Sequence, residues 1–146
     1  MLKVMVVEDS LAQRKAIANF LKSGGVVAIE AKNGIEALSL LEAQKPHIIL
    51  LDAIMPGMNG YELCRRLKSN PTTQHIPIIM CTGQDNASDR YWAMKQGADA
   101  YLVKPFRPAE LIELLKQFLR PSSAQATASE PIPQAIAPLS AAASPG

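Results

Sequence analysis

With 146 residues, 48% of them hydrophobic, the chain can bury one core of ordinary domain size but not two. The formal net charge is only +2, so no surface of one sign is expected to recruit nucleic acid or an anionic membrane. The sequence has no apolar run near the roughly 18 residues that span a bilayer, and it begins without the pattern of a cleavable signal. We therefore expect one domain that works in the cytoplasm, without DNA binding or membrane insertion.

Apolar runs alternate with amphipathic segments along most of the chain. Five short runs rich in Val and Ile are typical of buried parallel strands, and they cover residues 2–7, 26–30, 47–51, 76–81 and 100–103. Five segments with helical periodicity follow them in turn, at residues 10–23, 34–44, 60–69, 87–96 and 108–119. This alternation predicts an α/β fold of the (βα)5 type: a doubly wound parallel sheet of five strands with helices on both faces.

The first predicted helix begins with a recognisable capping pattern. Ser10 is followed three residues later by a glutamine, which is the spacing of a capping box. Gly24 and Gly25 then end the helical periodicity, as glycines commonly do after the last turn. Ile17, Phe20 and Leu21 share one face, so this helix is expected to pack against the sheet.

The composition changes sharply after Arg120. From residue 121 to residue 146, proline, serine and alanine make up 18 of the 26 residues, and Glu130 is the only charged one. Such a segment cannot bury enough apolar surface to offset the entropy lost on ordering. We predict a folded domain over residues 1–120 and a disordered tail over residues 121–146.

Polar side chains follow four of the five predicted strands. Glu8 and Asp9 follow the first strand, Asp52 the third, Thr82 the fourth and Lys104 the fifth. In a doubly wound sheet, ligands bind outside the carboxyl ends of the strands. Three carboxylates, a hydroxyl and an ammonium are therefore expected to meet at one edge of the sheet.

Such a cluster has a specific electrostatic requirement. If the first and third strands are neighbours, about 4.8 Å apart, the three carboxylates repel one another and raise at least one pKa. Lys104 alone leaves a net charge of about −2, which one Mg²⁺ ion would balance. The site can then accept a phosphoryl group, with Asp52 as the nucleophile that forms an acyl phosphate. Lys104 and the Thr82 hydroxyl would stabilise the phosphoryl oxygens.

Four stretches of the chain resemble the receiver domain of two-component response regulators, of the CheY-like single-domain kind. They occur in the family's order and at its spacings, and they read VVEDS, ILLDAIMPGMNG, IIMCTG and YLVKPF. The resemblance covers about residues 1–120 and implies a flavodoxin-like sheet with strand order 2-1-3-4-5. It also implies that a histidine kinase phosphorylates Asp52.

The resemblance assigns metal ligands as well. It implies that Asp9 and Asp52 bind Mg²⁺ directly, together with the backbone carbonyl of Ile54, and that Glu8 acts through water. Glu8 departs from the family pattern, in which Asp is the commonest residue at this position. The longer side chain suits a role through water, so the metal site is still expected.

Three more residues match the family's switch and its active-site lysine. Thr82 matches the switch hydroxyl, Tyr101 the switch aromatic and Lys104 the lysine. The resemblance implies that phosphorylation draws the hydroxyl toward the site and lets the aromatic ring turn inward. This would shift the face formed by the fourth helix, fifth strand and fifth helix, which a downstream protein then reads.

One stretch narrows the expected pathway. Residues 89–106 are similar to the PilH type of CheY-like regulators, which work with type IV pili in twitching or phototactic motility. A CheA-like kinase would fit such a role. Flagellar chemotaxis, a phosphorelay carrier and a phosphorylation-independent interaction module remain open.

Enzymes of two other classes fit less well. A phosphatase of the haloacid dehalogenase type needs a second acid two residues after its nucleophile, where this chain has Ile54. The glycine-rich motifs of nucleotide-binding enzymes do not occur in the sequence. We therefore expect no enzyme activity beyond Mg²⁺-dependent self-phosphorylation and slow self-dephosphorylation.

Several reactive residue types are assigned no chemistry. Cys64, Cys81, His47 and His75 have no partners at metal-ligand spacing, so packing or solvated loops are the preferred interpretation. Trp92 lies in the fourth predicted helix, where it is either core or partner surface. The sequence leaves that choice open.

Overall fold

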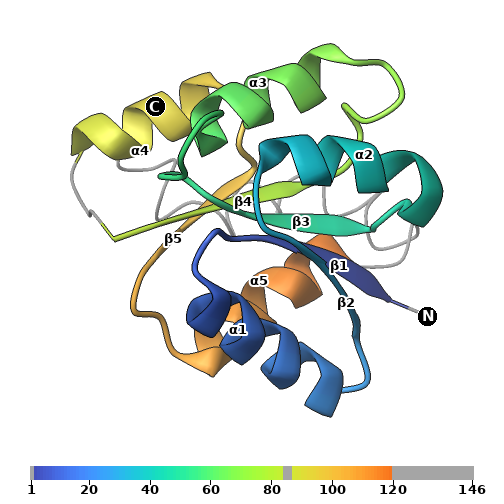
Figure 1. The fold of residues 1–146 in the computed structure, drawn as a ribbon. Coiled ribbons are helices and arrows are strands. Elements are labelled where there is room, and N and C mark those ends of the chain that lie inside the picture. Colours follow the sequence, from blue (N-terminus) through green and yellow to red (C-terminus); the bar gives the residue numbers. More distant parts are fainter. Residues whose placement is uncertain (1, 84–86, 120–146) are drawn as a thin grey trace, which may run out of the picture.

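The computed structural model describes residues 2–83 and 87–119. In this part of the chain, strands and helices alternate as predicted (Figure 1). The strands are β1 (Lys3–Val7), β2 (Val27–Ala31), β3 (Ile48–Asp52), β4 (Ile78–Thr82) and β5 (Ala100–Val103). The helices are α1 (Leu11–Ser23), α2 (Gly34–Gln44), α3 (Gly60–Ser69), α4 (Ala87–Lys95) and α5 (Pro108–Phe118). The predicted tail, residues 121–146, lies outside the described residues, so the boundary at residue 120 stays a prediction.

All five strands form one parallel sheet in the order β2-β1-β3-β4-β5. The register pairs Val7 with Leu51 and Asp52 with Cys81, so that β1, β3 and β4 end at the same edge. The predicted fold and strand order are therefore confirmed. None of the described helices is both long and apolar enough to cross a membrane.

The helices cover both faces of the sheet. Helices α2, α3 and α4 lie on one face, and α1 and α5 lie on the other (Figure 1). Every residue of β3 and β4 is buried, and successive residues belong to different cores: Leu50 packs toward α1 and α5, whereas Leu51 packs toward α2 and α3. Burial on both faces explains why these strands are continuously apolar rather than alternating.

Side-chain caps fix where α1, α2 and α3 begin. Asn33 and Asn59 accept hydrogen bonds from backbone N–H groups in the first turns of α2 and α3. In α1 the Ser10 hydroxyl accepts the Gln13 N–H at 3.3 Å, but the reciprocal half of the predicted capping box is absent. The Ser10 N–H donates instead to Glu8 Oε2 at 3.1 Å, which leaves the Gln13 side chain for another contact.

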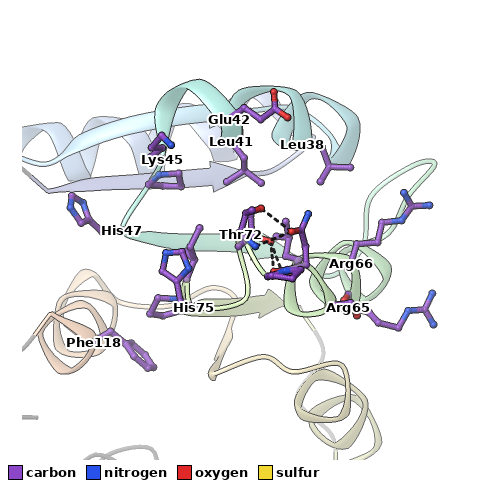
Figure 2. Close-up of a pocket in the computed structure, with 18 of the residues that line it drawn as sticks. Leu38, Leu41, Glu42, Lys45, His47, Arg65, Arg66, Thr72, His75 and Phe118 are labelled. Carbon is purple, nitrogen blue, oxygen red and sulfur yellow. Dashed lines mark hydrogen bonds between the residues drawn. The ribbon is translucent and has the colours of Figure 1, made fainter. Parts of the chain in front are cut away.

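A hollow of about 1420 Å³ lies at the amino-terminal edge of the sheet, between the ends of α2 and α3 and the 70–77 loop (Figure 2). Among the described residues that line it, Glu42 is the only acid, so no carboxylate cluster forms there. His47 and His75 lie at this edge, and His47 Nδ1 accepts the Lys3 backbone N–H at 3.0 Å. This hollow has none of the predicted site residues. At or just beyond the opposite edge of the sheet lie Glu8, Asp9, Asp52, Ile54, Thr82 and Lys104.

The two cysteines are core residues. Cys64 and Cys81 are both free and buried. Burial raises the pKa of each thiol to about 12, so neither forms a thiolate at neutral pH. The structure agrees with the interpretation of both residues as packing groups.

Candidate active site

Three carboxylates converge at the carboxyl edge of the sheet. Glu8 and Asp9 directly follow β1, and Asp52 is the last residue of the neighbouring strand β3. One oxygen from each of these three side chains lies within 4.8 Å of the others. Glu8 and Asp52 are only 3% and 7% exposed, whereas Asp9 is exposed. The cluster is thus buried at its base and open at Asp9.

Lys104 crosses from the end of β5 to this cluster. Its ammonium lies 2.6 Å from Glu8 Oε1 and 3.3 Å from Asp52 Oδ1. A third acceptor is Gln13 Oε1, at 2.8 Å. Burial lowers the pKa of Lys104, but the hydrogen bond to Glu8 and the charges of Asp52 and Glu8 outweigh it, so the pKa is raised overall. The lysine therefore stays charged.

The pKa of Asp52 is raised in this site. Burial is the largest cause and raises its pKa from the ordinary 3.8 to about 6. The Lys104 charge opposes this rise, and the neighbouring Glu8 carboxylate adds to it. A raised pKa in the cluster was predicted from carboxylate repulsion, but burial is the leading cause because Asp52 ends a strand that is covered on both faces.

A second hollow, the site hollow, opens beside these residues. It has a volume of about 880 Å³ and lies between α1 and the segment that leads from β5 into α5. Asp52, Lys104 and Ile54 line it together with apolar side chains that include Ile17 and Phe106. The Ile54 side chain is 64% exposed at its margin. A small phosphorylated donor therefore has room to approach Asp52.

Thr82 and Tyr101 lie on the face of the sheet that α2, α3 and α4 cover. Thr82, 2% exposed, ends β4 and pairs with Val103, while Tyr101 pairs with Met80 two residues earlier. The Tyr101 ring is 5% exposed and packs in the core beneath α4, with the Arg90 guanidinium carbon 5.5 Å from its centroid. The ring thus lies in the inward position that the resemblance assigns to the switch aromatic after phosphorylation.

Residues 4–116 match the family model described as the response regulator receiver domain. The chain belongs to the response regulator receiver family. Several curated relatives are longer, and the chain spans about half of their length. One of them is the phosphate regulon transcriptional regulatory protein PhoB of Pseudomonas aeruginosa, 40% identical over 117 residues, a match that covers 80% of this chain and 51% of PhoB.

One relative matches this receiver domain over its whole length. Protein PilH of Pseudomonas aeruginosa is 32% identical over 119 residues, which cover 82% of this chain and 98% of PilH. Among solved structures, the chemotaxis protein CheY4 of Vibrio cholerae superimposes with a TM-score of 0.77 at 30% identity, covering 82% of this chain and 99% of CheY4. The CheY-like and PilH-like resemblance is therefore confirmed.

A third comparison bears on the metal. The receiver domain of the sensor histidine kinase PA1611 of Pseudomonas aeruginosa has a magnesium ion coordinated in its active-site cleft. It superimposes on this chain with a TM-score of 0.74 at 30% identity, covering 80% of this chain and 96% of that domain. Receiver domains thus bind Mg²⁺ at an acidic pocket. The Glu8, Asp9 and Asp52 oxygens fit such an ion, because Mg²⁺ prefers a few carboxylate oxygens and retains several waters.

Gly60 begins α3 directly against the end of β3. A Cβ atom at Gly60 would lie 2.2 Å from the Asp52 carbonyl oxygen and 2.8 Å from the Ala53 Cα. The Gly60 N–H also donates to the Ala53 carbonyl at 2.9 Å. The sequence predicted a helix that begins at this glycine, and the structure shows that the glycine brings this helix onto the backbone of Asp52.

Replacing Gly60 with Ala is expected to lower the free energy of unfolding by about 2 kcal/mol, because the backbone must shift to admit the methyl group. Urea denaturation measures this change. Gly83→Ala is the matched control, since a Cβ at Gly83 meets no atom within 4 Å. Equal stabilities of the two variants would contradict the tight contact at Asp52.

Proposed function

We propose that this receiver domain acts as a phosphorylation-switched response regulator that accepts a phosphoryl group on Asp52 from a histidine kinase. The observation that carries the proposal is the placement of the Asp52 carboxylate at the end of the central strand. There it lies beside one ammonium and two further carboxylates, at the floor of the site hollow. Receiver domains interact with histidine kinases and with downstream targets, which supports both partners in general terms.

The proposed step transfers a phosphoryl group from an oxygen or nitrogen atom of the donor to a carboxylate oxygen of Asp52. An ionised Asp52 oxygen attacks phosphorus, a bond to that oxygen forms, and the bond from phosphorus to the donor group breaks with its electron pair leaving on the donor. The Lys104 ammonium and the Thr82 hydroxyl would donate to the phosphoryl oxygens. Mg²⁺, bound by Asp9, Asp52 and the Ile54 carbonyl with Glu8 acting through water, would supply further positive charge to these oxygens.

The proposed output is protein docking on the face of α4, β5 and α5. Tyr91 and Trp92 are 57% and 50% exposed on α4, and their rings pack edge to face with centroids 6.2 Å apart. Exposed aromatic side chains are frequent anchors in protein interfaces. The question of Trp92 that the sequence left open is thereby answered in favour of a surface position. No DNA contact or membrane insertion is proposed, and the site of action is the cytoplasm.

The proposed switch couples Thr82 to Tyr101 along the shared face of β4 and β5. When the Thr82 hydroxyl moves toward the phosphoryl group, it would leave space beside β4, and the inward-facing Tyr101 ring would occupy that space. A phosphorylation-independent interaction module is the second candidate function, because the exposed aromatic pair on α4 would serve such a module equally well. The likeness to PilH supports a motility pathway with a CheA-like kinase.

The test is incubation with acetyl phosphate and Mg²⁺, followed by intact-mass spectrometry. We expect the mass to rise by one phosphoryl group, and chelation of Mg²⁺ to prevent the rise. A protein that gains no mass under these conditions would favour the interaction module.

The proposed regulator is not an enzyme that turns over a substrate, and its acyl phosphate should decay slowly. Ile54 overhangs the site hollow and has no group that can orient or deprotonate an attacking water. We expect the adduct to last for minutes or longer, and Ile54→Ala to decay severalfold faster because water gains access. Release of inorganic phosphate measures the rate.

The matched control for this experiment is Ile35→Ala. Ile35 is 71% exposed on α2 and does not line the site hollow, so its removal should leave the lifetime unchanged. Decay within seconds, together with no effect of Ile54→Ala, would show that Ile54 does not shield the phosphoryl group.

A further inference from the structure

Gln13 contacts the site lysine but has no part in the proposed reaction. It lies in the first turn of α1, where its backbone N–H is held by the Ser10 hydroxyl at 3.3 Å. Its side-chain oxygen accepts a hydrogen bond from the Lys104 ammonium at 2.8 Å. The two residues are 91 positions apart in the sequence, so this contact arises only from the fold.

The Lys104 ammonium has three N–H donors, and three acceptors surround it. Glu8 Oε1 lies at 2.6 Å, Gln13 Oε1 at 2.8 Å and Asp52 Oδ1 at 3.3 Å. The carboxylate of Asp52, although charged, is the most distant of the three. Glu8 and Gln13 therefore make the two shorter contacts with the ammonium, and Asp52 makes the longest.

The position of the Lys104 ammonium bears on how it could contact a phosphoryl group on Asp52. Asp52, Lys104 and Gln13 all line the site hollow, so oxygens added to Asp52 would lie in the space that these residues border. The ammonium can exchange its long contact with Asp52 for a phosphoryl oxygen and keep its two shorter contacts. If the ammonium instead made its shortest contact with Asp52, it would have to break that charged hydrogen bond before it could contact a phosphoryl oxygen.

We propose that Gln13 is a positioning residue whose side-chain oxygen holds the Lys104 ammonium on the hollow side of Asp52, ready to contact an incoming phosphoryl group. The inference rests on the proposed phosphorylation of Asp52. A purely structural role for the Gln13 side chain is disfavoured by two observations. The cap of α1 uses its backbone N–H, which any residue except proline supplies, and the residue itself is exposed.

The variant that tests this inference is Gln13→Met, which keeps the length and helix propensity of the side chain but removes its acceptor. Each protein is titrated with Mg²⁺ and then, when saturated, with beryllofluoride as a mimic of the phosphoryl group, and backbone amide NMR follows both titrations. Gln44→Met is the matched control, because Gln44 ends α2 and lies outside the site hollow.

Gln13→Met is expected to bind beryllofluoride about fivefold more weakly, which is the net size of one ordinary hydrogen bond. Its Mg²⁺ affinity and melting temperature should equal those of the wild type, and Gln44→Met should change neither affinity. The split between the two affinities is the decisive readout, since a general loss of structure would weaken both.

Three outcomes would overturn the inference. Unchanged or tighter beryllofluoride binding by Gln13→Met would show that Gln13 does not prepare Lys104 for the phosphoryl group. A parallel loss of Mg²⁺ affinity would show that Gln13 acts on the metal or on the fold. If the wild type itself binds no beryllofluoride, the proposed function fails and the inference falls with it, a result distinct from the other two.

Discussion

Replacing Asp52 with Asn is expected to abolish phosphoryl uptake and, without Mg²⁺, to raise the free energy of unfolding at pH 7 by about 2 kcal/mol. The amide is no nucleophile toward phosphorus under these conditions, so the adduct is lost. Stability rises because the charged Asp52 carboxylate is only 7% exposed, and burial holds its pKa at about 6. An amide carries no charge that must be desolvated.

This stability gain has a defined pH dependence. A carboxyl group whose pKa is raised in the folded state binds its proton more tightly there, so wild-type stability falls as the pH rises from about 4 to about 6. Below pH 4 the group is protonated in both states, and the advantage of Asp52→Asn disappears. Urea denaturation of both proteins at pH 4 and pH 7 measures it. A less stable Asp52→Asn at pH 7 would contradict the electrostatic account of the site.

Replacing Lys104 with Met is expected to have the opposite effect on stability and to slow phosphorylation by orders of magnitude. The change leaves the buried carboxylates of Glu8 and Asp52 without their cation, which costs about 3 kcal/mol of unfolding free energy. Added Mg²⁺ should restore much of this loss, because it supplies the missing positive charge. Melting temperatures with and without Mg²⁺ measure the loss of stability and its restoration, and the rate of mass gain with acetyl phosphate measures the slower phosphorylation.

Lys15→Met is the matched control for that variant. Lys15 also contacts a carboxylate, Glu30, at 3.0 Å, but its side chain is 53% exposed. Exposed ion pairs contribute little, so the control should lose less than about 1 kcal/mol and should not respond specifically to Mg²⁺. If Lys104→Met is no less stable than this control, the ammonium does not neutralise the acid cluster.

The positions of Asp52 and Thr82 were predictable because a parallel sheet aligns the carboxyl ends of its strands. Continuous Val and Ile runs located β3 and β4, and the polar residue that ended each run had to lie at the common edge. The same argument placed Glu8 and Lys104. These side chains are brought together by the topology alone, so one pattern of strands and helices sufficed to predict the cluster.

The contact of Gln13 could not be predicted in this way. Its spacing from Ser10 indicated a capping box, which is a local pattern, whereas its actual partner is Lys104, at the far end of the domain sequence. The longer side chain of Glu8 reaches the Ser10 N–H and takes the place that the glutamine would have had. Competition of this kind depends on side-chain reach in three dimensions.

The exposure of Trp92 also could not be predicted from the sequence. Helix α4 has no strong apolar stripe, and Ala93 is the only buried residue among those described in it. Helical periodicity therefore gave no face to assign to the sheet. Only the packed position of α4 shows that Tyr91 and Trp92 point outward.

The central claim, that Asp52 is the phosphoacceptor, is tested most directly by locating the acyl phosphate. The protein is incubated with acetyl phosphate and Mg²⁺, reduced with borohydride, which converts an aspartyl phosphate to homoserine, and mapped by peptide mass spectrometry. We predict homoserine at residue 52 and unmodified Glu8 and Asp9. Modification at either of those two residues, with Asp52 intact, would contradict the assignment.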